Sequence, residues 1–167
     1  MRKELYEKIV VTVLLVASFA FLPAIGYSNW EMDNPLPHVA YMFCHANVWH
    51  LAGNVFVLWI MRGKLHMIPS LMIAFIFSFL PSWSLWGGVG VTMGFSGVLF
   101  AICGIKWGIY CYYASSMGRI FGRTTALREF AIKALPFALI GIVIPHLNWC
   151  IHLYCMLAGF VYGRCRR

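Results

Sequence analysis

Apolar runs separated by short polar connections fill most of the chain. Runs long enough to be membrane helices lie at residues 9–27, 46–61, 65–80, 95–114, 127–144 and 149–163. About 20 apolar residues span the hydrocarbon core of a bilayer as an α-helix. We therefore predict an all-α membrane protein whose six transmembrane helices form one bundle, with a single domain over residues 1–167. The first run follows charged residues, like a signal peptide, but its length favours a retained anchor.

Composition narrows the class to integral membrane proteins. The 167 residues are 62% hydrophobic and 11% charged, and their mean hydropathy is +0.78, whereas soluble domains carry about a quarter charged residues. In a soluble protein the net charge of +8 would suggest a nucleic-acid partner. Here the placement of the basic residues matters more than their sum, and we expect no nucleic-acid partner.

The basic residues fall on one side of the predicted six-helix arrangement. They are Arg2, Lys3, Lys8, Arg62, Lys64, Arg119, Arg123, Arg128 and the C-terminal arginines. The opposite connections, residues 28–44, 81–93 and 145–148, contain no Lys or Arg. Lys106 lies ~15 Å along a helix from Ser96, where its side chain can snorkel to the basic side. By the positive-inside rule, we predict that both termini are cytoplasmic. We expect a multi-pass protein of a bacterial plasma (inner) membrane, with the site open to the outer side.

The six cysteines are scattered and form no C-x-x-C pair. Their spacing does not indicate a zinc knuckle or a thioredoxin-like motif, so most are expected to be small buried apolar residues. Cys44 and Cys150 fall near the same membrane face, and whether they pair stays open. No metal and no cofactor are predicted.

Polar side chains gather at the predicted outer halves of three helices. His50 and Asn54 are four residues apart and share one face of the second helix. Ser96 opens the fourth helix, and His152 lies one turn into the sixth. For any one of them an interhelical hydrogen bond is the simpler explanation. Four polar groups converging at one membrane depth instead indicate a functional site.

A serine and a histidine at this depth can act as nucleophile and general base. Ser96 would attack, and His152 would accept its proton. The free N–H groups at the start of the helix, with His50 and Asn54, could bind the resulting oxyanion. All five carboxylates lie in the cytoplasmic or outer connections, so we predict a dyad with no third member. His146, in the loop before the last helix, is the rival candidate for the base.

Four further residues are expected to contact substrate or to pack around the dyad. Phe100 lies one turn after Ser96 and could pack against the imidazole. Gly94 and Gly97 bracket the serine, where they allow a sharp turn and a close helix approach. His45, just before the second helix, is the fourth.

Three segments resemble motifs of the rhomboid intramembrane serine proteases. Residues 45–54 (HANVWHLAGN) are similar to the family's second-helix motif, and residues 94–101 (GFSGVLFA) to its G-x-S-G nucleophile segment. Residues 148–152 (NWCIH), followed by Gly159 and Gly163, are similar to the sixth-helix segment that brings the histidine. The three segments occur in the family's order and on the expected helices.

The resemblance implies a serine endopeptidase that cleaves transmembrane or membrane-anchored proteins near their outer ends. Ser96 would be the nucleophile and His152 the base. His50 and Asn54 would stabilise the oxyanion together with the region of Ser96 and Phe95. The implied substrates are single-span membrane proteins, cleaved within the lipid bilayer in a cavity open to the outer side.

Two other functions stay open. An inactive rhomboid-like protein that binds transmembrane helices would share the fold, although the intact Ser96 and His152 weigh against it. A haem- or metal-binding membrane protein would use the outer-side histidines, which are His45, His50, His146 and His152. The chain also departs from the family pattern. Cys155 stands where glycine is frequent, Phe100 stands where tyrosine is common, and the first outer loop lacks the usual Trp-Arg pair.

Overall fold

Helices form most of the chain, which confirms a mainly helical protein. The computed structural model describes residues 2–28, 33–83, 90–116, 124, 127–139, 142–144 and 147–166. These residues contain no β-strand, only one isolated backbone pairing between Tyr27 and Thr92. The helices are α1 (Arg2–Phe21), α2 (Pro35–Ala40), α3 (Val48–Ile60), α4 (Met67–Ser78), α5 (Ser96–Ser116), the π-helical turn η1 (Phe130–Ala134), α7 (Leu135–Leu139) and α8 (Trp149–Cys165).

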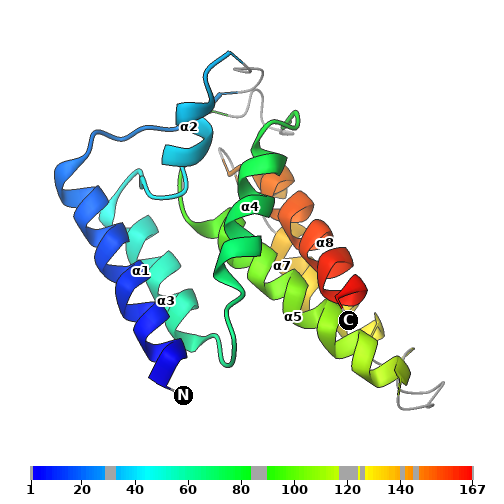
Figure 1. Ribbon diagram of the computed structural model, residues 1–167. Helices are drawn as coiled ribbons and strands as arrows, with labels where there is room; N and C mark the ends of the chain where they lie inside the picture. The colour runs from blue at the N-terminus through cyan, green and yellow to red at the C-terminus, as the bar shows by residue number, and fades with distance from the viewer. Residues whose placement is uncertain are drawn as a thin grey trace.

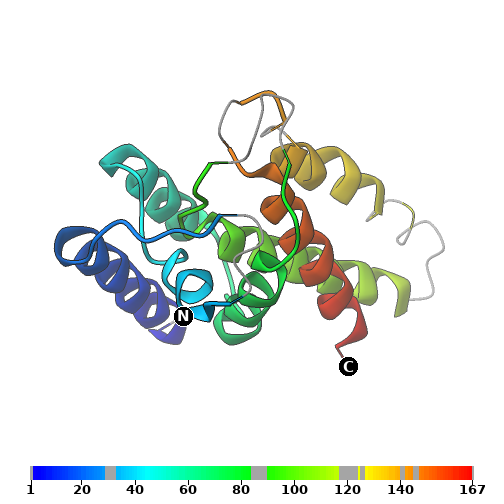
Figure 2. The same cartoon turned by 90° about the horizontal axis from the view of Figure 1, so that it is seen from above.

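The long helices lie side by side, with α5 and α8 forming the most extensive contact (Figure 1). Helices α1 and α3 pack together on one side of this pair, and α7 packs against α8 on the other, as the view from above also shows (Figure 2). Helix α4 contacts both α5 and α8. The two termini lie at the same end of the bundle, and the short helix α2 lies at the opposite end (Figure 1).

One helix within the described residues is long and apolar enough to cross a membrane. It is the 19-residue stretch Ser96–Ala114 of α5. Helices α3 and α4 are apolar but shorter, and at ~1.5 Å per residue the 13 residues of α3 extend only ~20 Å, against the ~30 Å of a hydrocarbon core. Helix length and composition therefore support one span directly, and the six-span bundle stays a prediction.

The first helix is shifted toward the N-terminus relative to the predicted 9–27. Glu4 and Lys8, four residues apart on α1, form an ion pair of 3.2 Å that favours helix in the charged segment. The Lys8 ammonium also donates to the backbone carbonyl of Met61, just beyond α3. The helix ends before Pro23, because a proline disfavours helical backbone in the residue that precedes it.

Two other elements differ from the apolar pattern. The predicted fifth helix over 127–144 is interrupted by η1, where the Leu135 N–H bonds to the Phe130 carbonyl five residues back. Pro136 follows and has no N–H to continue the regular bonding, which favours a wider turn. The outer connection contains α2, which the pattern does not predict. Asn34 is the N-cap of α2, and its side chain accepts the Leu36 N–H at 3.0 Å. A proline occupies the first turn, where its missing N–H costs no hydrogen bond.

Glycines allow α5 and α8 to approach closely. A Cβ added at any of four glycines would overlap backbone atoms of the facing helix; the four are Gly104, Gly108, Gly159 and Gly163. Cys155, where a glycine was expected, is fully buried, and its sulfur lies opposite Gly97. A Cβ added at Gly97 would lie 3.6 Å from this sulfur, which is ordinary contact, so the helices pack together with the larger residue in place.

Basic side chains meet at the end of the bundle opposite α2. The Lys106 ammonium donates to the carbonyl of Arg62, at the end of α3, which agrees with the expected snorkelling of Lys106. Arg166 donates to Nδ1 of His66, between α3 and α4, at 2.8 Å. These contacts place Lys106 beside Arg62 and Arg166 beside His66, while the side of the membrane on which they lie stays a prediction.

None of the six cysteines forms a disulfide. The sulfur of Cys44 lies 3.6 Å from the carbonyl oxygen of Pro23, and the sulfur of Cys150 lies 3.5 Å from the backbone of Trp83. The Cys44–Cys150 pairing that the sequence left open is not formed.

Candidate active site

Ser96 is the first residue of α5, and the extended segment before it is held on both sides. Thr92 exchanges two backbone hydrogen bonds with Tyr27, of 2.8 and 3.1 Å. Gly94 donates its N–H to the carbonyl of Tyr41 at 2.7 Å. The φ angle of Gly94 is +120°, a conformation that glycine adopts without strain. This turn places the serine at the mouth of the helix.

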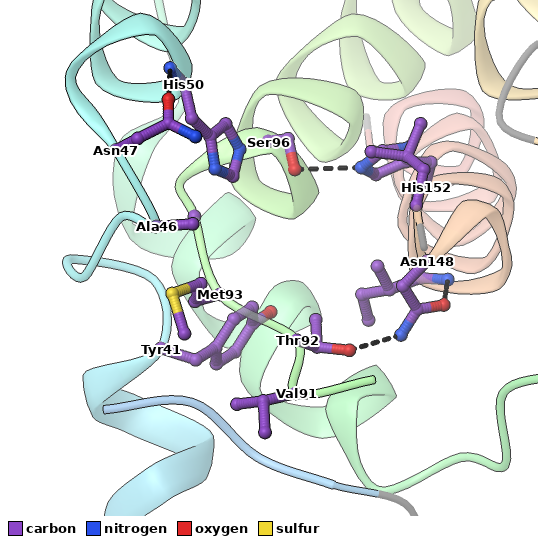
Figure 3. A pocket seen from close by; sticks show the side chains of 13 residues that line it. Tyr41, Ala46, Asn47, His50, Val91, Thr92, Met93, Ser96, Asn148 and His152 are labelled. Carbon is purple, nitrogen blue, oxygen red and sulfur yellow. Dashed lines mark hydrogen bonds between the residues drawn. The ribbon is translucent and has the colours of Figure 1, made fainter. Parts of the chain in front are cut away.

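His152 lies one turn into α8 and faces Ser96. Asn148 is the N-cap of this helix, and its side-chain oxygen accepts the Ile151 N–H at 3.2 Å. Ser96 Oγ and His152 Nε2 are 2.8 Å apart, which is hydrogen-bond distance (Figure 3). If the hydroxyl donates to Nε2, the ring carries its hydrogen on Nδ1. Nδ1 is buried and has no hydrogen-bond partner, so no carboxylate of the described residues orients this imidazole from behind.

Phe100 takes the place next to the imidazole that the sequence predicts for it. Its ring stacks on that of His152, with centroids 4.4 Å apart and planes at 25°. This stacking on the face of the imidazole restrains the plane of the ring, in addition to the hydrogen bond at Nε2. Serine hydrolases often orient the ring differently, with a polar group at Nδ1.

His50 and Asn54 approach the site from α3. Asn47 caps this helix by accepting the His50 N–H at 2.9 Å, which fixes the first turn. A Cβ on Gly94 would lie 2.7 Å from His50 Nε2 and 3.4 Å from Asn54 Nδ2, so both side chains reach the turn before Ser96. The Asn54 amide nitrogen is buried without a hydrogen-bond partner. An unpaired buried donor is costly unless a ligand or water meets it.

A cavity of about 210 Å³ lies between α3, α5, α8 and the segment before Ser96. Its lining includes four of the predicted site residues, namely His50, Gly94, Ser96 and His152. The lining residues that sequence reasoning missed are Tyr41, Ala46, Asn47, Val91, Thr92, Met93, Leu147, Asn148 and Ile151. The asparagines before α3 and α8 carry a helix-capping signal, but the apolar members give none, since they look like any other residues of a membrane helix or loop.

Other predicted site residues lie behind the cavity. The Phe95 side chain is fully buried and packs near Phe43, so only its backbone could serve an oxyanion. His45 is buried with its ring edge-on to His50 at 5.2 Å, and it does not line the cavity. Gly97 faces Tyr41 and α8 rather than the cavity.

The alternatives for these histidines have less support. Across the residues that the structure describes, no three His, Cys, Asp or Glu side chains come close enough together to hold a metal ion. His146, the rival for the base and a member of the alternative haem or metal set, lies outside the described residues. Among the histidines that the structure describes, His152 is the one in contact with Ser96.

Comparison with known proteins bears on the family. A family model described as the Rhomboid domain matches residues 33–167 and so includes Ser96, His152 and every cavity-lining residue. No curated protein and no solved structure matches the chain. The family match covers most of the chain and agrees with the mainly helical structure. The chain therefore belongs to the rhomboid family and is an integral membrane protein.

Proposed function

We propose that the protein is an intramembrane serine endopeptidase that uses Ser96 and His152 as a catalytic dyad. The observation that carries this proposal is the 2.8 Å contact between Ser96 Oγ and His152 Nε2 at the wall of a cavity. In the first step Oγ bonds to the scissile carbonyl carbon while Nε2 takes the hydroxyl proton. The imidazolium then gives that proton to the leaving amine. Water attacks the acyl-enzyme by the same route and releases the second product.

His50, Asn54 and the backbone of Ser96 are the proposed oxyanion donors. The Leu99 N–H bonds to the Phe95 carbonyl, so α5 begins here and the Ser96 N–H has no acceptor within the helix. His50 lines the same cavity, and the Asn54 amide lies behind it at Gly94. Donors fixed in advance around a developing negative charge stabilise a tetrahedral intermediate. The unpartnered Asn54 amide is explained if it acts in this way.

The proposed arrangement in the membrane follows from the charges. The whole chain forms one six-span domain, with both termini cytoplasmic in the plasma membrane of a bacterium. The Lys106–Arg62 contact then marks the cytoplasmic level, and Ser96, ten residues away on the same helix, lies ~15 Å nearer the outer side. A cavity of this volume can hold several water molecules. Single-span membrane proteins would be cleaved there.

A second Ser–His pair shows what separates Ser96 from a structural serine. His38 Nδ1 and Ser78 Oγ are also 2.8 Å apart, but both residues are almost fully buried. The Ser78 hydroxyl donates to the Phe75 carbonyl at 2.6 Å, and His38 is stacked between aromatic rings. Neither residue lines the cavity around Ser96. A Ser–His contact alone therefore does not indicate a catalytic pair, whereas a Ser–His contact at the wall of a cavity does. This difference favours the protease over an inactive helix-binding relative.

The test is cleavage of a single-span reporter substrate by the full chain in liposomes. We expect Ser96→Ala and His152→Ala each to abolish cleavage, and the double variant to be little worse, because the two residues act as a unit. Ser78→Ala is the matched control and should keep activity. Cleavage by the Ser96→Ala variant, or no cleavage by the folded wild-type chain of any of a panel of substrates, would contradict the proposal.

A further inference from the structure

A buried side-chain hydrogen bond links the segment before Ser96 to the start of α8. Asn148 Nδ2 donates to Thr92 Oγ1 at 2.7 Å, and both residues are more than nine-tenths buried (Figure 3). Thr92 is four residues before Ser96, and Asn148 is four residues before His152. The bond therefore joins equivalent positions on the two chain segments that carry the proposed dyad.

Each partner of this bond is itself fixed to its own segment. The other side-chain atom of Asn148, Oδ1, accepts the Ile151 N–H and caps α8. The backbone of Thr92 is paired on both sides with Tyr27. Because one amide group meets both the cap and the threonine, a shift of α8 relative to the Ser96 segment must break at least one of these bonds.

The dyad needs such a support at this end of the helices. His152 Nδ1 has no hydrogen-bond partner, so the position of the ring depends on the first turn of α8 and on the stacking of Phe100. The contacts in which a glycine of α8 meets the backbone of α5 begin at Gly159, seven residues and ~10 Å beyond His152. Nearer the dyad, α8 faces Gly97 with side chains instead of backbone, and the Asn148–Thr92 bond adds a directional contact there.

From this geometry we infer that Asn148 and Thr92 form a clamp that positions His152 against Ser96. The inference rests on the proposed function and deepens it, because it names the residues that hold the dyad together in the absence of an orienting carboxylate. Asn148 and Thr92 are positioning residues: they act through the placement of His152 and take no part in proton transfer. A displacement of about 1 Å at a reacting pair can cost on the order of a hundredfold in rate.

The test uses variants that remove or keep the two side-chain groups of this hydrogen bond. Thr92→Val removes Oγ1 and keeps the side-chain shape, whereas Thr92→Ser keeps the oxygen. Asn148→Ser keeps a capping oxygen but is too short to reach residue 92. We measure kcat and KM for a reporter substrate, the rate of Ser96 phosphonylation by a fluorophosphonate, and amide hydrogen exchange of the first turn of α8.

We expect Thr92→Val and Asn148→Ser each to lower kcat and the phosphonylation rate by about ten- to a hundredfold with KM little changed. Thr92→Ser should restore both rates, and the Thr92→Val/Asn148→Ser double variant should be no slower than either single variant. Hydrogen exchange at the Ile151 amide should become faster in Thr92→Val, whether or not the protein is an enzyme.

Three results would overturn the clamp. They are wild-type phosphonylation in folded Thr92→Val, equal losses in Thr92→Val and Thr92→Ser, and unchanged hydrogen exchange of the first turn of α8. The proposed function fails separately: if the wild-type chain neither cleaves substrates nor reacts with fluorophosphonate, but exchange still responds to Thr92→Val, the clamp stands and the protease does not.

Discussion

Substitution of Gly94 by alanine should damage the oxyanion side of the site in addition to destabilising the fold. The φ angle of Gly94 is +120°, which strains any residue with a Cβ by about 1–3 kcal/mol. The new Cβ would lie 2.6 Å from His50 Cε1 and 2.7 Å from Nε2, whereas ordinary contact begins at 3.4 Å. The His50 imidazole would therefore have to move by about 0.8 Å away from the new Cβ of residue 94.

Two other glycines separate the strain from the collision. Gly63 has a φ angle of +77° and no atom within 4 Å of an added Cβ, so Gly63→Ala carries backbone strain alone. Gly53, on α3 beside Asn54, also has no atom within 4 Å and no positive φ, so Gly53→Ala carries neither. Neither glycine lines the cavity.

The assay is reporter cleavage in liposomes, with unfolding in detergent measured in parallel. Gly94→Ala should lose on the order of a hundredfold in turnover, because His50 is displaced by nearly 1 Å, and a few kcal/mol of stability. Gly63→Ala should lose about 1–3 kcal/mol of stability and keep its turnover. Gly53→Ala should match the wild type or be slightly more stable. Wild-type turnover in Gly94→Ala, or an equal loss of turnover in Gly63→Ala, would refute the role given to His50.

Two further predictions concern Asn54 and His66. Asn54→Ala should lower turnover on the order of a hundred- to a thousandfold, the usual effect of removing one oxyanion donor; an unchanged rate in the cleavage assay would make Asn54 an interhelical tether only. Burial, with the cations Arg166, Lys64 and Lys106, lowers the pKa of His66 from its usual 6.5. The unfolded chain then binds a proton at His66 more readily than the folded chain does, so the free energy of unfolding should decrease as the pH falls below about 6.5. The unfolding midpoints at pH 5 and pH 8 should differ less in His66→Asn than in the wild type. Asparagine is chosen because its side chain tolerates the left-handed backbone of residue 66. An unchanged difference would exclude His66 as the source of the pH dependence.

The sequence predicts the parts of the site that depend on helix periodicity. His50 and Asn54 share a face because they are four residues apart, and Phe100 reaches His152 because it lies one turn after Ser96. Membrane helices are regular, so depth and facing follow from counting residues. Cys155, where the family pattern suggests glycine, is accommodated between the helices, because its sulfur lies at ordinary contact distance from the Gly97 position of α5.

What the sequence could not predict depends on irregular backbone and long-range contacts. The Asn148–Thr92 bond joins residues 56 positions apart, and no local pattern marks either residue as its partner. The π-helical turn that starts at residue 130 interrupts a segment in which hydrophobicity indicates one continuous helix. The short α2 lies in a segment in which hydrophobicity indicates only a loop. Phe95 was expected at the oxyanion because it adjoins Ser96; its side chain is buried in the core, so that prediction now concerns its backbone alone.

The central claim is that Ser96 is a nucleophile activated by His152, and a fluorophosphonate tests it most directly. The full chain in liposomes is treated with the reagent, and the modified residue is identified by mass spectrometry. We predict one adduct on Ser96 in the wild type and in Ser78→Ala, and a strongly slowed reaction in His152→Ala. An adduct on another serine, or labelling of Ser96 at the same rate without His152, would contradict the account.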